Sequence, residues 1–226
     1  MRFAATMKAR FAGLRIVISP LLAPAFLAPA LPGGVDALIF TSETGVEAFR
    51  RLSAGRSCAG ARAWCVGDRT AAAARAVGLV ARSAAGDATA LVAAIRDAGE
   101  AGPLLHLRGA ETRGNIAESL ISAGLETLEA VVYAQVPQPL SSEALRLLHD
   151  AAPIILPLFS PRTAALFVSA AGTRAPAAPL WVAAMSGSVV DALAPLLPQH
   201  IIMAERPDAL AMADVVATLI AAARHA

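Results

Sequence analysis

The chain has 226 residues, of which 57% are apolar, 16% charged and 4% aromatic, and its formal net charge at pH 7 is +2. So much apolar surface with so little net charge excludes a disordered chain. The charges form no large basic field and no basic run, which argues against a nucleic-acid partner. The length suits one large domain or two small ones, each able to bury its own core.

The longest uncharged stretch, residues 16–35, is long enough to cross a membrane. It contains four prolines and a Gly-Gly pair, which would break a spanning helix repeatedly. The first eleven residues carry scattered cations and lack the uninterrupted apolar core of a signal peptide. Apolar strands buried on both faces of a parallel sheet have the same hydropathy. We therefore expect a cytoplasmic protein with no membrane partner.

Short apolar runs alternate with helical patterns along the whole chain, which is typical of an α/β protein with parallel sheets. The predicted strands are residues 14–18, 37–40, 63–66, 104–107, 128–133, 154–159, 180–184 and 200–203. The predicted helices are residues 2–11, 43–52, 69–77, 88–98, 114–123, 142–149, 162–170, 188–197 and 208–224.

The two halves of the chain resemble each other weakly. Residues 39–49 (IFTSETGVEAF) match residues 157–167 (PLFSPRTAALF), and the next predicted strand contains Trp64 in the first copy and Trp181 in the second. This repeat predicts two similar α/β domains with a ligand site between them. The proline-rich residues 20–32 and residues 133–139 look like two segments that both cross between the domains. One domain is therefore expected to be inserted into the other. We expect domain 1 at residues 1–22 and 139–226, domain 2 at 34–132, and the linker at 23–33 and 133–138.

Several familiar catalytic motifs are absent. The chain has no GxxxxGK[ST] loop, no GxGxxG and no GxSxG. Its histidines are dispersed, and none has another His or a Cys at ligand spacing, which argues against a metal site. Cys58 and Cys65 form neither a CxxC nor a disulfide framework. Cys65 ends a predicted strand among apolar neighbours, so we interpret it as a buried structural thiol rather than a nucleophile.

Small hydroxyl residues and glycine gather where predicted strands lead into helices. The carboxyl ends of parallel strands face the ligand crevice, where free helical N–H groups and the helix dipole favour anions. One such residue alone is as well explained as a helix cap, but five junctions on one predicted face indicate an anion-lined cleft. The junctions are Thr41-Ser42, Gly67 to Thr70, Arg108-Gly109, Ser160 to Thr163 and Ser186 to Ser188.

Some charged residues at these junctions are candidates for the same site. Arg69, Arg108, Arg113 and Arg162 could each hold a carboxylate, or could be solvated arginines at a helix start. Asp68 could act as an acid or base, or cap the helix that follows it.

Tyr133 is the only tyrosine in the chain and closes a predicted strand at the start of a crossing segment. Apart from a catalytic role, it could be an interface tyrosine with a hydrated hydroxyl.

Four segments keep the order and spacing of a known family, and the chain resembles uroporphyrinogen-III synthases of tetrapyrrole biosynthesis. These segments are residues 37–49, 64–79, 104–137 and 158–171. The resemblance implies two flavodoxin-like domains, each a doubly wound parallel sheet in three αβα layers, joined by a two-stranded linker. It also implies an active site in the cleft between the domains, with neither a metal nor an organic cofactor, and we expect a monomer.

The implied reaction is that of a lyase, which closes linear hydroxymethylbilane to uroporphyrinogen III with loss of water and inversion of ring D. The eight carboxylates of this substrate would suit a cleft lined with amides and hydroxyls. By its place before the linker, Tyr133 matches the family's tyrosine, which is proposed to assist departure of the hydroxyl. Thr70 matches the threonine of a Gly-x-x-Thr turn, and Thr41, Ser42 and Ser160 match hydroxyl positions after strands. Arg108, Arg113 and Arg162 complete the expected substrate contacts.

Two features depart from the family. Residues 186–190 read SGSVV where many members place Pro and Thr, so Ser186 and Ser188 are expected to substitute. The family's opening strand, the central one in a flavodoxin-like order of 2-1-3-4-5, does not precede residues 2–11. We expect Met1 to be a misassigned start or the chain to be truncated, with low stability and reduced activity as it stands. The alternative function is a non-catalytic synthase-like module that binds anions or regulates.

Overall fold

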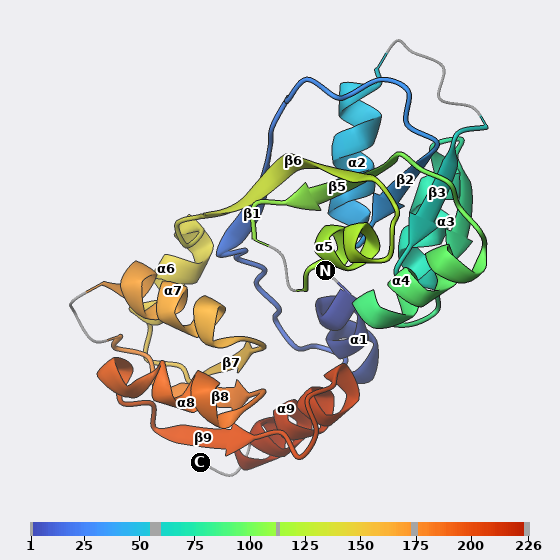
Figure 1. The fold of residues 1–226 in the computed structure, drawn as a ribbon. Coiled ribbons are helices and arrows are strands. Elements are labelled where there is room, and N and C mark those ends of the chain that lie inside the picture. Colours follow the sequence, from blue (N-terminus) through green and yellow to red (C-terminus); the bar gives the residue numbers. More distant parts are fainter. Residues whose placement is uncertain (1, 55–59, 112–113, 173–175, 224–226) are drawn as a thin grey trace. The chain divides into compact units, whose positions relative to one another are not determined.

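The computed structural model describes residues 2–54, 60–111, 114–172 and 176–223, and shows the mixed α/β architecture that the sequence predicts (Figure 1). The chain divides into two compact units. Unit 1 comprises Met1–Ala23 and Pro137–Ala226, and unit 2 comprises Pro24–Val136. Within the described ranges, none of the helices combines the length and the apolarity needed to cross a membrane.

The sheet of unit 2 is built mainly from parallel strands. Its strands are β1 (Leu22–Phe26), β2 (Ala37–Phe40), β3 (Arg62–Cys65), β4 (Val80–Ser83), β5 (Leu104–Gly109) and β6 (Thr127–Pro137). They lie in the order β1-β6-β5-β2-β3-β4, and β2 to β6 pair in parallel. β1 runs antiparallel to β6, since the Leu27 N–H donates to the Val132 carbonyl and the Gln138 N–H donates to the Leu21 carbonyl, both at 2.9 Å.

Helices cover both faces of this sheet. They are α2 (Glu43–Leu52) and α3 (Asp68–Ala76) on one face, and α4 (Ala88–Asp97) and α5 (Ile116–Ser122) on the other. Successive strand residues point to opposite faces, so Phe40 packs with Phe49 of α2, while Ile39 packs with Leu91 of α4 and Leu120 of α5. All four residues of β2 are buried, as expected for a parallel strand covered on both sides.

The order of these strands differs from the flavodoxin-like order expected from the sequence. Counted along the chain, the five parallel strands lie in the order 3-2-1-4-5, because the chain leaves β2 for β3 and β4 on one side and returns to β5 and β6 on the other. A flavodoxin-like sheet has the order 2-1-3-4-5. β4 was also not predicted: its four residues contain Arg82 and Ser83, and it lies at the sheet edge. From β2, the chain adds β3 and β4 on one side and β5 and β6 on the other, so its winding direction along the sheet changes between β2 and β5.

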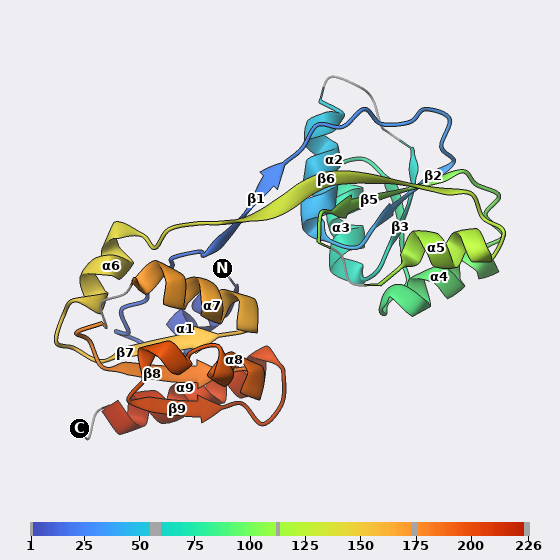
Figure 2. The same cartoon turned by 60° about the vertical axis from the view of Figure 1, so that its left-hand side comes forward.

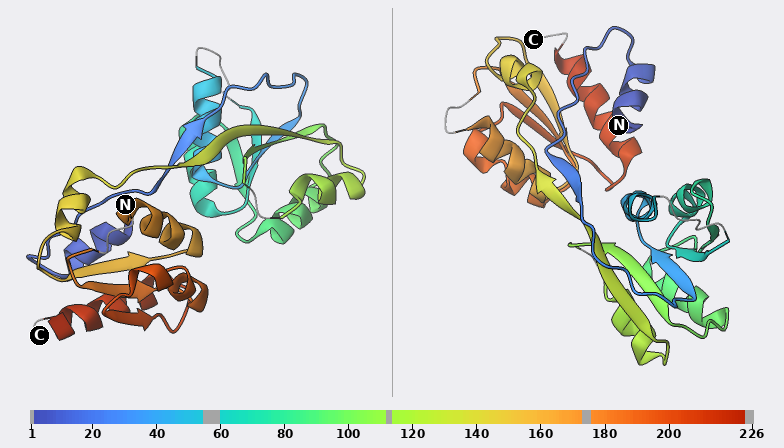
Figure 3. Two further views of the ribbon diagram at one scale, coloured as in Figure 1. Left: turned by 90° about the vertical axis from the view of Figure 1, so that its left-hand side faces the viewer. Right: turned by 90° about the horizontal axis from the view of Figure 1, so that it is seen from above.

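Unit 1 has a smaller parallel sheet. Its strands β7 (Ile154–Leu158), β8 (Leu180–Ala184) and β9 (His200–Met203) lie side by side in that order (Figure 2). One face is covered by α6 (Ser142–Leu148), α7 (Pro161–Ala171), α8 (Gly187–Asp191) and the 3₁₀ turn η1 (Ala194–Leu196). The other face is covered by α1 (Arg2–Arg10) and α9 (Ala209–Ala223), which lie beside each other in Figure 3.

Proline explains why one predicted helix is short, and two further differences lie near the start of the chain. The helix expected at residues 188–197 ends at Asp191, because Pro195 lacks an N–H and its ring clashes with the carbonyl four residues earlier, which is that of Asp191. Residues 14–18 were predicted as a strand and are irregular, with Leu14 and Ile16 packed against the cluster around α9. A strand forms instead at β1, where Pro24 is tolerated because β1 lies at the sheet edge.

Candidate functional site

Ser42 and Tyr133 meet at the carboxyl end of the unit 2 sheet. Ser42 follows β2 and caps α2, where its extended backbone (φ −152°, ψ 152°) lets Oγ accept a hydrogen bond from the Gly45 N–H at 3.0 Å. The same Oγ lies 2.9 Å from the Tyr133 hydroxyl, and either oxygen can donate in this contact. Tyr133 was predicted to close its strand, but β6 continues to Pro137, so Tyr133 lies within β6, which β5 separates from β2. The phenol therefore reaches across the end of β5 to the start of α2. This contact lies at the topological switch point between β2 and β5, where the winding direction of the sheet changes.

A pocket of about 680 Å³ lies at the same carboxyl end of the sheet, beside the ends of β2, β3 and β4. It is lined by residues 41–44 after β2, residues 66–70 after β3 and residues 85–86 after β4. α2 and α3 begin at this pocket, so the unpaired N–H groups of their first turns and the positive ends of their dipoles lie there. These features favour anionic groups such as carboxylates, whereas the side chains of Glu43 and Asp68, which also line the pocket, oppose them.

The first turn of α3 differs from the prediction. Gly67, not Asp68, is its N-cap, with an extended backbone (φ −151°, ψ 169°) and no side-chain cap hydrogen bond. Thr70 lines the pocket and is buried. Arg69 pairs with Glu43 of α2 at 3.2 Å between Nε and Oε1, and both side chains are exposed. This ion pair joins the two first turns that line the pocket.

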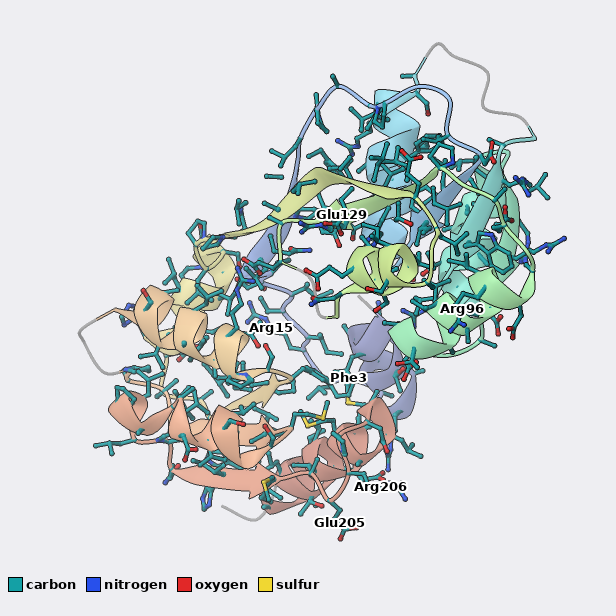
Figure 4. The ribbon with its side chains drawn as sticks, in the orientation of Figure 1. Phe3, Arg15, Arg96, Glu129, Glu205 and Arg206 are labelled. Atoms are coloured by element: carbon teal, nitrogen blue, oxygen red, sulfur yellow. The ribbon has the colours of Figure 1, made fainter. Side chains whose placement is uncertain are left out.

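Arg108 is held by protein groups on the β5–β6 side of the sheet. Its Nε lies 3.0 Å from Oε1 of Glu129, which Figure 4 shows on β6, and its Nη1 donates to the Gly109 carbonyl at 3.1 Å. His106 is buried, and its Nδ1 lies 3.3 Å from the same Glu129 oxygen. Burial lowers the pKa of His106, although the charge of Glu129 partly opposes that shift. The predicted contact of Arg108 with substrate stays a prediction, as does that of Arg113, which lies outside the described residues.

The hydroxyl residues predicted for domain 1 lie at the carboxyl ends of two neighbouring strands of unit 1. Ser160 follows β7 and caps α7, accepting a hydrogen bond from the Thr163 N–H at 3.2 Å. Ser186 follows β8 as the N-cap of α8, and its Oγ lies 3.4 Å from that of Ser188. Arg162 lies in the exposed first turn of α7.

Cys65 is a buried free thiol, as the sequence indicated. Burial raises its pKa to about 11, so the thiolate needed for nucleophilic attack is scarce near neutral pH. Cys58 lies outside the described residues. Within the described ranges, no three His, Cys, Asp or Glu side chains come together as ligands for a metal ion.

Sequence reasoning missed three residues around this edge. His106 was noted only as one of several dispersed histidines, Glu129 was not considered, and Gly109 was named only as a small residue at a junction. His106 and Glu129 are register partners on β5 and β6, and Gly109 is the partner of Tyr133. No local pattern marks such pairs, because strand register is set by residues far apart in the chain.

Comparison with known proteins places the chain in a family. The family model described as uroporphyrinogen-III synthase HemD matches residues 4–214, and no curated protein matches the chain. The crystal structure of uroporphyrinogen-III synthetase from Helicobacter pylori is similar with a TM-score of 0.66 and 19% identity, over 94% of this chain and 96% of that one. A mutant uroporphyrinogen III synthase from Thermus thermophilus gives 0.48 and 16%, over 100% and 97% of the two chains. Since the family model spans most of its length, the chain belongs to the uroporphyrinogen-III synthase family.

Proposed function

We propose that the chemistry of this family takes place at the carboxyl ends of the parallel strands of unit 2, with Tyr133 as the catalytic residue. The family's reaction closes hydroxymethylbilane to uroporphyrinogen III, with loss of the ring-A hydroxyl as water and inversion of ring D. Membership in the family supports this cyclising lyase reaction as the function of the chain.

The observation that carries the proposal is the 2.9 Å contact between the Tyr133 and Ser42 hydroxyls. When the C–O bond of the substrate breaks, the departing oxygen takes the phenolic proton and leaves as water, which is general-acid catalysis. The phenol oxygen is then left with negative charge. The Ser42 hydroxyl can donate to that oxygen, and the positive end of the α2 dipole lies beside it. The proton lost from ring D on closure restores the phenol.

The pocket beside this pair supports a role in holding substrate carboxylates. Thr41, Ser42 and Thr70 line it together with the first turns of α2 and α3, so amides and hydroxyls can bind carboxylates without a dense cluster of cations. Such a site folds a flexible tetrapyrrole so that its two ends meet, which is an orientation effect. The other proposed substrate contacts are Arg108, Arg113, Ser160, Arg162, Ser186 and Ser188.

Two domains are part of the same proposal, domain 1 at residues 1–22 and 139–226 and domain 2 at residues 34–132. Separate cores support this division, because every buried cluster lies within a single unit. For domain 1 the proposal includes a flavodoxin-like sheet, and what supports its three layers is that helices pack on both faces of the parallel strands β7, β8 and β9.

The deciding experiment is an assay of hydroxymethylbilane turnover by this chain and by Tyr133→Phe, separating the type III isomer from the spontaneous type I product. We expect kcat to fall by about 10²-fold in the variant, the lower end of what a general acid contributes, with KM little changed. The urea midpoint should stay near that of the parent chain. Full type III turnover by Tyr133→Phe would exclude Tyr133 as the acid. Type I product alone from the parent chain would favour a non-catalytic anion-binding module.

A further inference from the structure

Gly109 lies directly opposite Tyr133 in the unit 2 sheet. The register of β5 and β6 shifts between Arg108 and Gly109, and this irregularity makes Gly109 rather than Ala110 the partner of Tyr133. The Ala110 N–H donates to the Tyr133 carbonyl at 2.8 Å, which holds the two backbones together beyond the shift. Paired residues on neighbouring strands point to the same face of a sheet, so a side chain at position 109 would compete with the Tyr133 ring for space.

With the Tyr133 ring in its present position, there is no room for a side chain at position 109. A Cβ atom placed on Gly109 would lie 2.8 Å from Cζ, 2.9 Å from Cε2 and 3.0 Å from Oη of Tyr133. All three distances are well inside ordinary van der Waals contact. The backbone of Gly109 does not have a positive φ, so the requirement for glycine here comes from close approach of the ring and not from conformation.

The backbone under the ring is itself held in place. Nη1 of Arg108 donates to the Gly109 carbonyl, and the same guanidinium pairs with Glu129 on β6. The far end of the phenol is held by Ser42. The ring is therefore fixed between the bare backbone of β5 and the N-terminus of α2.

We infer that Gly109 is a positioning residue for Tyr133: its missing side chain lets the ring lie against β5 with its hydroxyl at Ser42. A methyl group at this position pushes the ring, which can rotate, away from Ser42 without removing any packed core group. The inference rests on the proposed function only for its effect on catalysis, because the position of the ring can be observed independently.

The test compares Gly109→Ala with Gly33→Ala, a unit 2 glycine with open space around its Cβ position and no positive φ. We expect Gly109→Ala to lower kcat for type III product by about 10-fold or more, because small misplacements of a catalytic group are costly, while KM changes little. Gly33→Ala should match the parent chain in both constants.

A spectroscopic measurement follows the ring directly. Since Tyr133 is the only tyrosine, protein labelled with ¹³C at tyrosine Cζ gives a single side-chain NMR signal. This signal should move in Gly109→Ala and stay in place in Gly33→Ala. An unmoved signal in Gly109→Ala would overturn the inference, with or without loss of activity. A moved signal with full activity would support the placement by Gly109 and instead refute catalysis by Tyr133.

A double-mutant cycle covers the case in which Gly109→Ala is unstable. If the methyl group acts through the ring, the fall in urea midpoint should disappear when Gly109→Ala is made in a Tyr133→Ala chain. A fall of the same size in both backgrounds would overturn the inference.

Discussion

At the scale of single residues, His106 is a buried side chain whose protonation the folded state opposes. It is 2% exposed, with Nδ1 at 3.3 Å from Glu129. Burial, the largest cause, lowers its pKa from the ordinary 6.5, and the positive charge of Arg108 acts in the same direction. Glu129 attracts the proton but does not reverse the shift. A proton therefore binds more readily to the unfolded chain than to the folded one.

We expect the free energy of unfolding to fall as the pH drops from 7.5 to 5.5. The stability associated with neutral His106 is fully present above pH 6.5 and is lost as the pH falls toward the lowered pKa of the folded state. Urea unfolding at several pH values measures this, with His106→Gln as the control that cannot titrate. The pH dependence should be shallower in the control, and an equal dependence in both chains would contradict the assignment.

At the scale of elements, two helices of unit 2 begin with comparable side-chain caps but differ in what else the cap touches. Ser42 accepts from the Gly45 N–H at the start of α2, and Asp87 accepts from the Ala90 N–H at the start of α4, both at 3.0 Å. The oxygen of Ser42 also contacts Tyr133. Asp87 is exposed, and within the described part of the chain its side chain contacts only the start of α4.

Ser42→Ala and Asp87→Ala should therefore have similar effects on stability and different effects on activity. Each change removes an N-cap hydrogen bond, which costs about 1 kcal/mol of stability. Ser42→Ala should in addition lower kcat for type III product by about 10-fold, since an electrostatic partner of the acid is lost. Urea midpoints and the isomer assay measure the two effects. Equal kcat in both variants would mean that the hydroxyl of Ser42 serves the helix only.

The elements themselves were predicted best where local signals agree. β8, β9 and α2 have the predicted bounds, because each is a periodic or apolar run between turn residues or caps. The end of α8 was mispredicted, and β1 was not among the strands predicted from apolar runs, because the effect of a proline depends on its place. Pro24 is harmless at a sheet edge, whereas Pro195 ends a helix.

At the scale of the whole molecule, unit 2 is one continuous segment and unit 1 is formed from both ends of the chain. Unit 2 contains the strands β2 to β6 and both of its core clusters, one on each face of the sheet. All the residues given for these two clusters belong to unit 2. The Ser42–Tyr133 contact also lies wholly within it.

We expect a fragment of residues 24–136 to fold alone. Circular dichroism should show α/β structure and urea should unfold it in one cooperative transition, as small single domains usually do. The tyrosine Cζ signal should match that of the full chain, because Ser42 and Gly109 are both present. A fragment without a cooperative transition would show that unit 2 depends on unit 1 for stability.

The sequence by itself determined the class of the fold, most of its strands and helices, and the hydroxyl residues that follow strands at the candidate site. These properties depend on apolar periodicity, caps and turn residues that are neighbours along the chain. Only the tertiary structure decided the 3-2-1-4-5 order in unit 2, the attachment of Arg108 to Glu129, and the meeting of Tyr133 with Gly109 and Ser42. Ser42 and Tyr133 are 91 positions apart, and such contacts follow from strand order and register, which packing of the whole sheet sets.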